Sequence, residues 1–281
     1  MAMRPSFTLL AVLTAATAFS DAASSQALFD LRNSRSLTLE QAVPEILKSR
    51  IVLVGEQHTD GGHHRAQLRV IQALVQAGAR VAIGLEMFRK DSQRALDHWT
   101  AGDISPQEFE RVYDDNWDYP WPVYSPIFEY ARAHKIPMIG LNVPRDITRQ
   151  VARRGFQSLT EEQRGRLSDI SCSIDEEYML YIRSVYGAHA HGNMNFTFFC
   201  EAQMVWDAAM SVHSLDFLKI APEGTLVILT GVGHAQKGAV PRQIGLRSQV
   251  PVTVMLPEIP GSIDTQTTGP QDADYLLLDL K

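Results

Sequence analysis

The sequence predicts an α/β fold, in which a mainly parallel β-sheet is flanked by helices and carries a helical insertion. The first observation is the apolar run Ile51–Val54, which stops at Gly55 in the way that a fully buried parallel strand does. A helical pattern and a second apolar run, Val81 to Leu85, follow it, and this strand–helix–strand spacing indicates parallel strands. A late run, Thr225 to Thr230, also ends at a glycine and indicates another strand of the same kind.

The first half of the chain shows alternating helix and strand patterns. An amphipathic helix is predicted from Leu37 to Lys48, before the first strand. A second helix follows Asp60, and Gly78 marks its carboxyl end because glycine is typical of helix C-caps. The next strand ends at Glu86. From Asp91 to Tyr124 the pattern is looser and rich in aromatic residues.

The second half contains a helix, a strand and then the insertion. Ser125 and Pro126 predict the start of a helix that runs to about His134, because serine is a good N-cap and proline fits the first helical position. Thr160 and Gln163 have the spacing of a capping box and begin a mostly helical insertion, roughly residues 157–219. Strands are expected at Ile136–Leu141, Thr225–Thr230, Val250–Met255 and Tyr275–Leu280.

Residues 1–27 have the composition of an export signal, and residues 28–281 are expected to form a single domain. Arg4 supplies a positive start, Phe7 to Phe19 is apolar and alanine-rich, and small residues follow. This stretch is too short for a comfortable membrane span. We expect cleavage near Ala23 or Ala27 and a soluble mature chain, periplasmic or secreted, with no transmembrane span; an unremoved anchor is the alternative.

The composition excludes nucleic acid as a partner and leaves open whether the two cysteines form a disulfide. The chain carries a formal net charge of −6 and no basic cluster, whereas nucleic-acid binding needs a basic face. Cys172 and Cys200 are the two cysteines. They form either a disulfide, worth about 3 kcal/mol for a loop of this length, or two buried free thiols.

Polar side chains follow three of the expected strands at the points where these strands end. Glu56 and His58 follow the first strand, Glu86 ends the second, and His234 follows the late strand in a repeated Gly-x-x-His pattern. Because ligands of open α/β sheets bind at the carboxyl ends of strands, we expect one site built from all four. Carboxylates with imidazoles predict either a divalent metal site or a metal-free site that activates water. The alternative is that each residue is a satisfied polar group at a strand end.

Three other polar residues are weaker candidates. His63 and His64 add ligands to the site or are solvated residues at a helix start. Arg145 follows a strand and is either an anion clamp, because guanidinium binds carboxylates in bidentate fashion, or part of an exposed ion pair.

A histidine-rich bend and an aromatic stretch lie elsewhere in the chain. His189 and His191 present ligands from a loop or form a polar turn, since residues two apart do not share a helix face. The aromatic stretch Tyr113–Tyr124 is either core or the surroundings of a flat, iron-bearing ligand.

The ordered set of motifs resembles the ChaN-type haem-binding uptake proteins, over roughly residues 37–256. These belong to a superfamily with the Tiki proteases, TraB and erythromycin esterase, which share paired Gly-x-x-His motifs and a glutamate. The motifs are Gly55-Glu-Gln-His58, His63-His64, Gln67, Leu85-Glu86, Asn142-Val-Pro-Arg145, His189-x-His191, Phe199-x-x-Ala-Gln-x-x-Trp-Asp207 and Gly231-Val-Gly-His234.

The resemblance implies an exported haem-binding protein for haem or iron uptake or storage, whose relatives can sandwich haems between two subunits of a homodimer. Iron ligation by tyrosine or histidine is implied with it. The candidate ligands in this chain are Tyr178, Tyr181, Tyr186, His189 and His191, with His64 as a further one and Arg145 near a propionate. The alternative function is a hydrolase, metal-dependent or with water activated by histidine and glutamate, at the strand-end residues. A binding module for another small molecule is the third reading.

Overall fold

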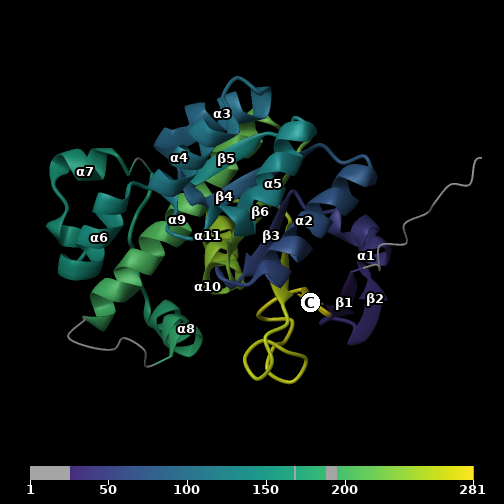
Figure 1. Cartoon of the computed structure of the whole chain (residues 1–281). Helices are drawn as coiled ribbons and strands as arrows, with labels where there is room; N and C mark the ends of the chain where they lie inside the picture. The colour runs from purple at the N-terminus through teal and green to yellow at the C-terminus, as the bar shows by residue number, and fades with distance from the viewer. Residues whose placement is uncertain (1–25, 168, 188–194, 281) are drawn as a thin grey trace, which may run out of the picture.

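The structure, a computed structural model, describes residues 26–167, 169–187 and 195–280, and within them one mixed sheet forms the centre of the fold (Figure 1). The strand order is β2-β1-β8-β7-β3-β6-β4-β5. All neighbours from β8 to β5 are parallel, which confirms the predicted fold class, while β1 pairs antiparallel with β2 and β8. The strands are β1 Ala27–Asp30, β2 Arg35–Thr38, β3 Ile51–Glu56, β4 Val81–Arg89, β5 Met138–Asn142, β6 Thr225–Gly231, β7 Val252–Pro257 and β8 Tyr275–Leu277.

Helices connect these strands and cover both faces of the sheet. They are α1 Leu39–Ile46, α2 Gly61–Gln76, α3 Gln93–Ala101, α4 Pro106–Asn116, α5 Trp121–Ala133, α6 Arg145–Arg154, α7 Glu161–Gly165, α8 Glu176–Tyr186, α9 Phe196–Ile220, α10 Val232–Ala235 and α11 Val240–Gly245, with 3-10 turns at Lys90–Ser92 and Phe156–Ser158. No helix of the described residues is both long enough and apolar enough to cross a membrane.

Two expectations for the middle of the chain were wrong. The region predicted as loose contains α3, α4 and the start of α5, because its aromatic residues bury a shared face: Trp99, Phe109 and Tyr113 are each at most 1% exposed. Helix α5 begins at Trp121 and not at Ser125, so Pro126 lies inside the helix. Its first turn is held by the Val123 amide, which donates to the Pro120 carbonyl at 3.1 Å.

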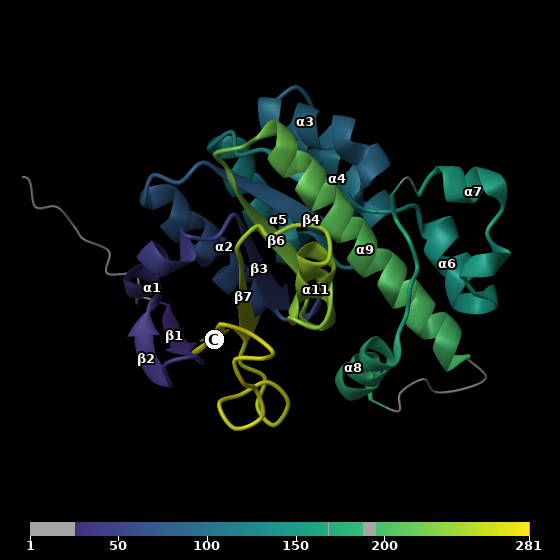
Figure 2. The same ribbon diagram turned by 180° about the vertical axis from the view of Figure 1, so that it is seen from behind.

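The side chains of the strands alternate between two hydrophobic cores, one on each face of the sheet. Val52 and Val54 pack with α2 and α5, whereas Ile51 and Leu53 pack with α9 and α11. Figure 1 shows α2 and α5 on the near face, and Figure 2 shows α9 crossing the other face beside α11. The alternation decides which face each polar residue at a strand end points to.

Between β5 and β6 the chain is mostly helical and includes α6 to α9. The predicted capping box is present at the start of α7, where Thr160 and Gln163 bond to each other's backbone. Helix α9 packs along α6 and the sheet, and α8 lies beside the amino-terminal half of α9 (Figure 2). This places α8 close to α10, the short helix that follows β6.

Candidate functional site

The four strand-end residues meet in one cavity of about 470 Å³, which we call the strand-end cleft. Glu56, His58, Glu86 and His234 all line it. The cavity lies at the carboxyl ends of β3 and β6, as ligand sites of open α/β sheets do. The strand β4 runs on to Arg89, so Glu86 lies within it and not at its end as predicted, directly after the last residue of β4 that pairs with β6. The other residues on its wall are mainly aromatic or amide side chains: Gln57, Trp117, Tyr119, Asn142, Gln203 and Trp206.

Glu56 is a buried carboxylate that accepts hydrogen bonds from three side chains. It continues the face of β3 that carries Val52 and Val54, so it points to α2 and α5. It accepts from His58 Nδ1 at 2.5 Å, from His64 Nε2 at 3.0 Å and from the Tyr124 hydroxyl at 3.1 Å. Burial alone would raise its pKa, but the hydrogen bonds and charges of the two histidines outweigh burial and lower the pKa to about 2.

His58 turns its free edge towards the cleft. Its ring lies 5.0 Å from the ring of Trp117 and 4.9 Å from that of Tyr119, and its side chain is 28% exposed. Burial opposes protonation, yet the hydrogen bond to Glu56 and the charge of Glu86 raise the pKa of His58. A Cβ at Gly231 would come within 3.0 Å of His58 Cε1, so the second Gly-x-x-His motif needs its glycine to leave room for the histidine of the first.

Glu86 points to the opposite face of the sheet, where it bridges β4 and β6. Its Oε2 accepts from the Thr230 hydroxyl at 2.5 Å and from the Gly231 amide at 2.7 Å. Its Oε1 lies 3.8 Å from His234 Nε2. The carboxylate therefore holds the end of β6 and faces one side of the His234 ring.

His234 is held on its other side by Asp207, which the sequence analysis did not single out as a site residue. Asp207 lies on α9, is fully buried, and accepts from His234 Nδ1 at 2.6 Å. Burial opposes protonation of His234, but the charges of Asp207 and Glu86 outweigh it and raise the pKa to about 9. Two features of the sequence could have identified Asp207 as a site residue. It is an acidic residue in the apolar middle of α9, and it belongs to the Trp206-Asp207 pair of the family motif.

The described tyrosines of α8 are used inside the protein. The Tyr178 hydroxyl donates to Asp207 Oδ2 at 2.5 Å, and the Tyr181 hydroxyl donates to the Gly233 carbonyl at 2.5 Å. Tyr178 is completely buried. The Tyr186 side chain, His189 and His191 lie outside the described residues, and their predicted role as iron ligands stays a prediction.

Arg145, His63 and His64 surround the cleft without lining it. Arg145 donates to Asp118 at 2.9 Å and to the Asn116 carbonyl at 2.6 Å, so it holds the loop that carries Trp117 and Tyr119. His63 accepts from the Gln57 amide at 3.0 Å, and His64 bonds to Glu56. Both histidines are buried, so neither is a solvated residue at a helix start.

Metal and disulfide chemistry have no geometric support in the described part of the chain. Within residues 26–167, 169–187 and 195–280, no group of three or more His, Cys, Asp and Glu side chains is arranged to hold a metal ion. The predicted metal role of the strand-end residues is therefore unsupported, since their carboxylates are engaged by histidines, Thr230 and backbone. Cys172 and Cys200 are free thiols, and burial raises their pKa values to about 12 and about 11.

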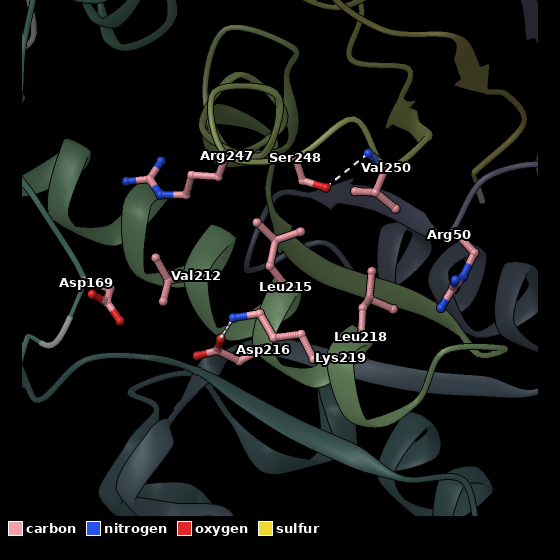
Figure 3. Close-up of a pocket in the computed structure, with 10 residues that line it drawn as sticks. All are labelled: Arg50, Asp169, Val212, Leu215, Asp216, Leu218, Lys219, Arg247, Ser248 and Val250. Atoms are coloured by element: carbon pink, nitrogen blue, oxygen red, sulfur yellow. Dashed lines mark hydrogen bonds and ion pairs between the residues drawn. The ribbon is translucent and has the colours of Figure 1, made fainter.

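A second cavity, of about 500 Å³, lies near the carboxyl end of α9 (Figure 3). Its cationic side chains already have partners within the protein. Lys219 pairs with Asp216 at 2.7 Å, Arg50 donates to the Gly224 carbonyl at 2.8 Å, and Arg247 donates to Gln243. The convergent histidines and carboxylates make the strand-end cleft the stronger candidate for chemistry.

Comparisons with known proteins identify the family. The family model described as haem-binding uptake, Tiki superfamily, ChaN, matches residues 42–244. ChaN of Campylobacter jejuni, solved with cofacial haem, has a similar fold, with a TM-score of 0.70 and 18% identity, over 91% of this chain and 97% of that one. An erythromycin esterase, EreC, gives a TM-score of 0.48 at 15% identity, over 78% of this chain and 72% of that one.

A curated relative lies outside the bacteria. RETICULATA-RELATED 5, a chloroplast protein of Arabidopsis thaliana, is 23% identical over 73% of this chain, which spans only 30% of that protein. The description of the family model names haem binding, and the likeness to the ChaN structure shows a shared fold. The family model matches residues 42–244, which is well over half of this chain. The chain therefore belongs to the ChaN family of haem-binding uptake proteins in the Tiki superfamily.

Proposed function

We propose that this chain is an exported haem-binding protein that serves the uptake or storage of haem iron. The observation that carries the proposal is its membership of the ChaN family over residues 42–244. A bound haem carries the iron, and tyrosine or histidine ligands from the protein set its reactivity.

The outer face of α8 fits a flat apolar ligand with acidic groups. Leu180 on this face is 60% exposed and offers an apolar contact to such a ligand. Arg183 lies with its guanidinium 4.9 Å from the ring of Phe196 and is a cation suited to a propionate. We therefore place haem on this face of α8, with its iron ligand from Tyr186, His189 or His191.

The other predicted ligands are less suitable in this arrangement. Tyr178 and Tyr181 donate to Asp207 and Gly233 in the interior, and His64 is buried against Glu56 and the ring of Tyr124. The strand-end cleft brings two carboxylates and two imidazoles together, and we assign this polar cluster to the second candidate function below and not to haem.

Titration of the mature protein with haem tests the proposal. We expect a saturable Soret band at a defined stoichiometry, weakened at least tenfold in affinity by Tyr186→Phe or by His189→Ala with His191→Ala. The control, His134→Ala, removes an exposed imidazole at the end of α5 and should bind haem as the wild type does. Sedimentation with and without haem shows whether two copies share the ligand, as the proposed homodimer requires. Absence of a saturable band would overturn the proposal.

Export is part of the proposal, with the signal at the start of the chain removed after Ala23. Gln26 donates to the Leu278 carbonyl, and Ala27 pairs with Thr38 in the sheet, so cleavage at Ala27 would remove residues that the fold uses. The amino-terminal sequence of protein recovered from the periplasm or medium should therefore begin at Ser24. An intact Met1, or a chain that begins at Leu28, would contradict this prediction.

A second candidate function is hydrolysis in the strand-end cleft. The observation that favours it is the pair of imidazoles there, each held through Nδ1 by a buried carboxylate: His58 by Glu56 and His234 by Asp207. His58 Nε2 would take a proton from water, whose oxygen then attacks a carbonyl carbon. His234 would give its proton to the leaving group as the ester or amide bond breaks. Glu86 stabilises protonated His234 during this cycle.

A further inference from the structure

Three buried side chains form one continuous chain of hydrogen bonds from α8 to the cleft. The Tyr178 hydroxyl donates to one oxygen of Asp207 at 2.5 Å, and the other oxygen accepts from His234 Nδ1 at 2.6 Å. Tyr178 and Asp207 are fully buried, and His234 is 6% exposed. Because both bonds share one carboxylate in a medium of low polarity, a change in one bond changes the strength of the other.

Helix α8 also contacts the turn that carries His234. The Tyr181 hydroxyl donates to the carbonyl of Gly233, the residue directly before His234. The Tyr181 ring lies against Gly238, where an added Cβ would come within 2.6 Å of Tyr181 Cδ2. A displacement of α8 therefore acts on the His234 turn through two separate tyrosines.

The groups that face His234 come from three parts of the chain: α9, β4 and the turn after β3. They are Asp207 on α9, Glu86 on β4, His58 after β3, and the ring of Trp206 at 5.8 Å. Glu86 is 3.8 Å from Nε2, beyond hydrogen-bond length. Asp207 is thus the partner at hydrogen-bond distance that sets the orientation of the ring.

We propose that Asp207 is the positioning residue of His234, and that Tyr178 makes this positioning depend on where helix α8 lies. A ligand bound on the outer face of α8 then changes the hydrogen bonding of His234 in the strand-end cleft. The ligand class is a porphyrin, and this part rests on the proposed haem function; the relay from Tyr178 to His234 does not. If the bound porphyrin changes the affinity of the cleft for its own ligand by some factor, linkage requires that a ligand in the cleft changes the affinity for the porphyrin by the same factor.

The test is the low-field proton resonance of His234 Nδ1–H in the full mature protein, assigned by its loss in His234→Gln. Asp207→Asn should abolish the short charge-assisted bond and with it the low-field position. Tyr178→Phe should shift the resonance, because Asp207 loses one donor. Gly238→Ala removes no hydrogen-bonding group but pushes on Tyr181, and it should shift the resonance as well.

Gly245→Ala is the matched control, since a Cβ there meets nothing within 4 Å. Its spectrum should keep the wild-type position. A wild-type position in Tyr178→Phe and Gly238→Ala, or a low-field position retained in Asp207→Asn, would overturn the relay. If Tyr178→Phe or Asp207→Asn does not fold, the resonance positions of Gly238→Ala and Gly245→Ala are compared, and the relay requires a shift in the first variant alone.

Zinc protoporphyrin, a diamagnetic probe, tests the link to the ligand. We expect a saturable shift of the His234 resonance with the same midpoint as the absorbance change of the porphyrin. Binding without this shift would overturn the coupling. Failure of both zinc protoporphyrin and haem to bind would overturn the proposed haem function, and the relay would then stand or fall on the variants alone.

Discussion

Replacing Glu56 by alanine is expected to lower the free energy of unfolding by about 3–5 kcal/mol, as loss of one partner of a buried ion pair does. The carboxylate is 1% exposed and accepts from His58, His64 and Tyr124, so all three donors lose their acceptor. Urea unfolding at pH 7 measures the change. Glu129→Ala, which truncates an exposed carboxylate on α5, is the control and should stay within about 0.5 kcal/mol of wild type.

The same residue should make the fold sensitive to acid. Its pKa falls from 4.5 to about 2 on folding, so its contribution is present above pH 4.5 and is lost as the pH falls towards 2. At neutral pH this contribution is about 3 kcal/mol. Wild-type stability should therefore drop across this window, while Glu56→Ala should show a much flatter dependence. Parallel acid curves for the two proteins would contradict this assignment.

Hydrolysis by the strand-end cleft, if assayed with a panel of carboxylic esters and amides, should fall at least 100-fold in kcat/KM in His58→Ala and in His234→Ala. His134→Ala, an exposed histidine at the end of α5, should retain full activity. The expected loss follows from the roles of the two imidazoles, one as base and one as acid.

The pH profile should be bell-shaped. His58 acts as base only when it is unprotonated, and its pKa is raised above the ordinary value, so the rate rises as the pH passes through this raised pKa. His234 acts as acid only when protonated, and its pKa is about 9, so the rate falls above about pH 9. Activity that survives in His58→Ala, or a profile without an alkaline limb, would exclude this mechanism.

Several features of the fold and site followed from short-range patterns. The apolar runs at β3, β4 and β6 predicted buried parallel strands, because strands covered by helices on both faces need apolar residues throughout. Their carboxyl ends placed Glu56, His58, Glu86 and His234 at one edge of the sheet. Helices α3 and α4 were missed, since their many aromatics hid the helical period, and α5 was predicted with too late a start because its internal Pro126 was read as a first helical position.

The sequence by itself determined the fold class, the strand-end residues and, through the ordered motifs, the family. The tertiary structure decided how these residues pair: Glu86 bonds to Thr230 across 144 residues, and β6 lies between β3 and β4. It also showed that Tyr178 and His234 are both hydrogen-bonded to Asp207, which makes Asp207 a site residue. Local periodicity cannot show such pairings, because they depend on strand order and on the packing of α8 and α9, which only the folded chain brings together.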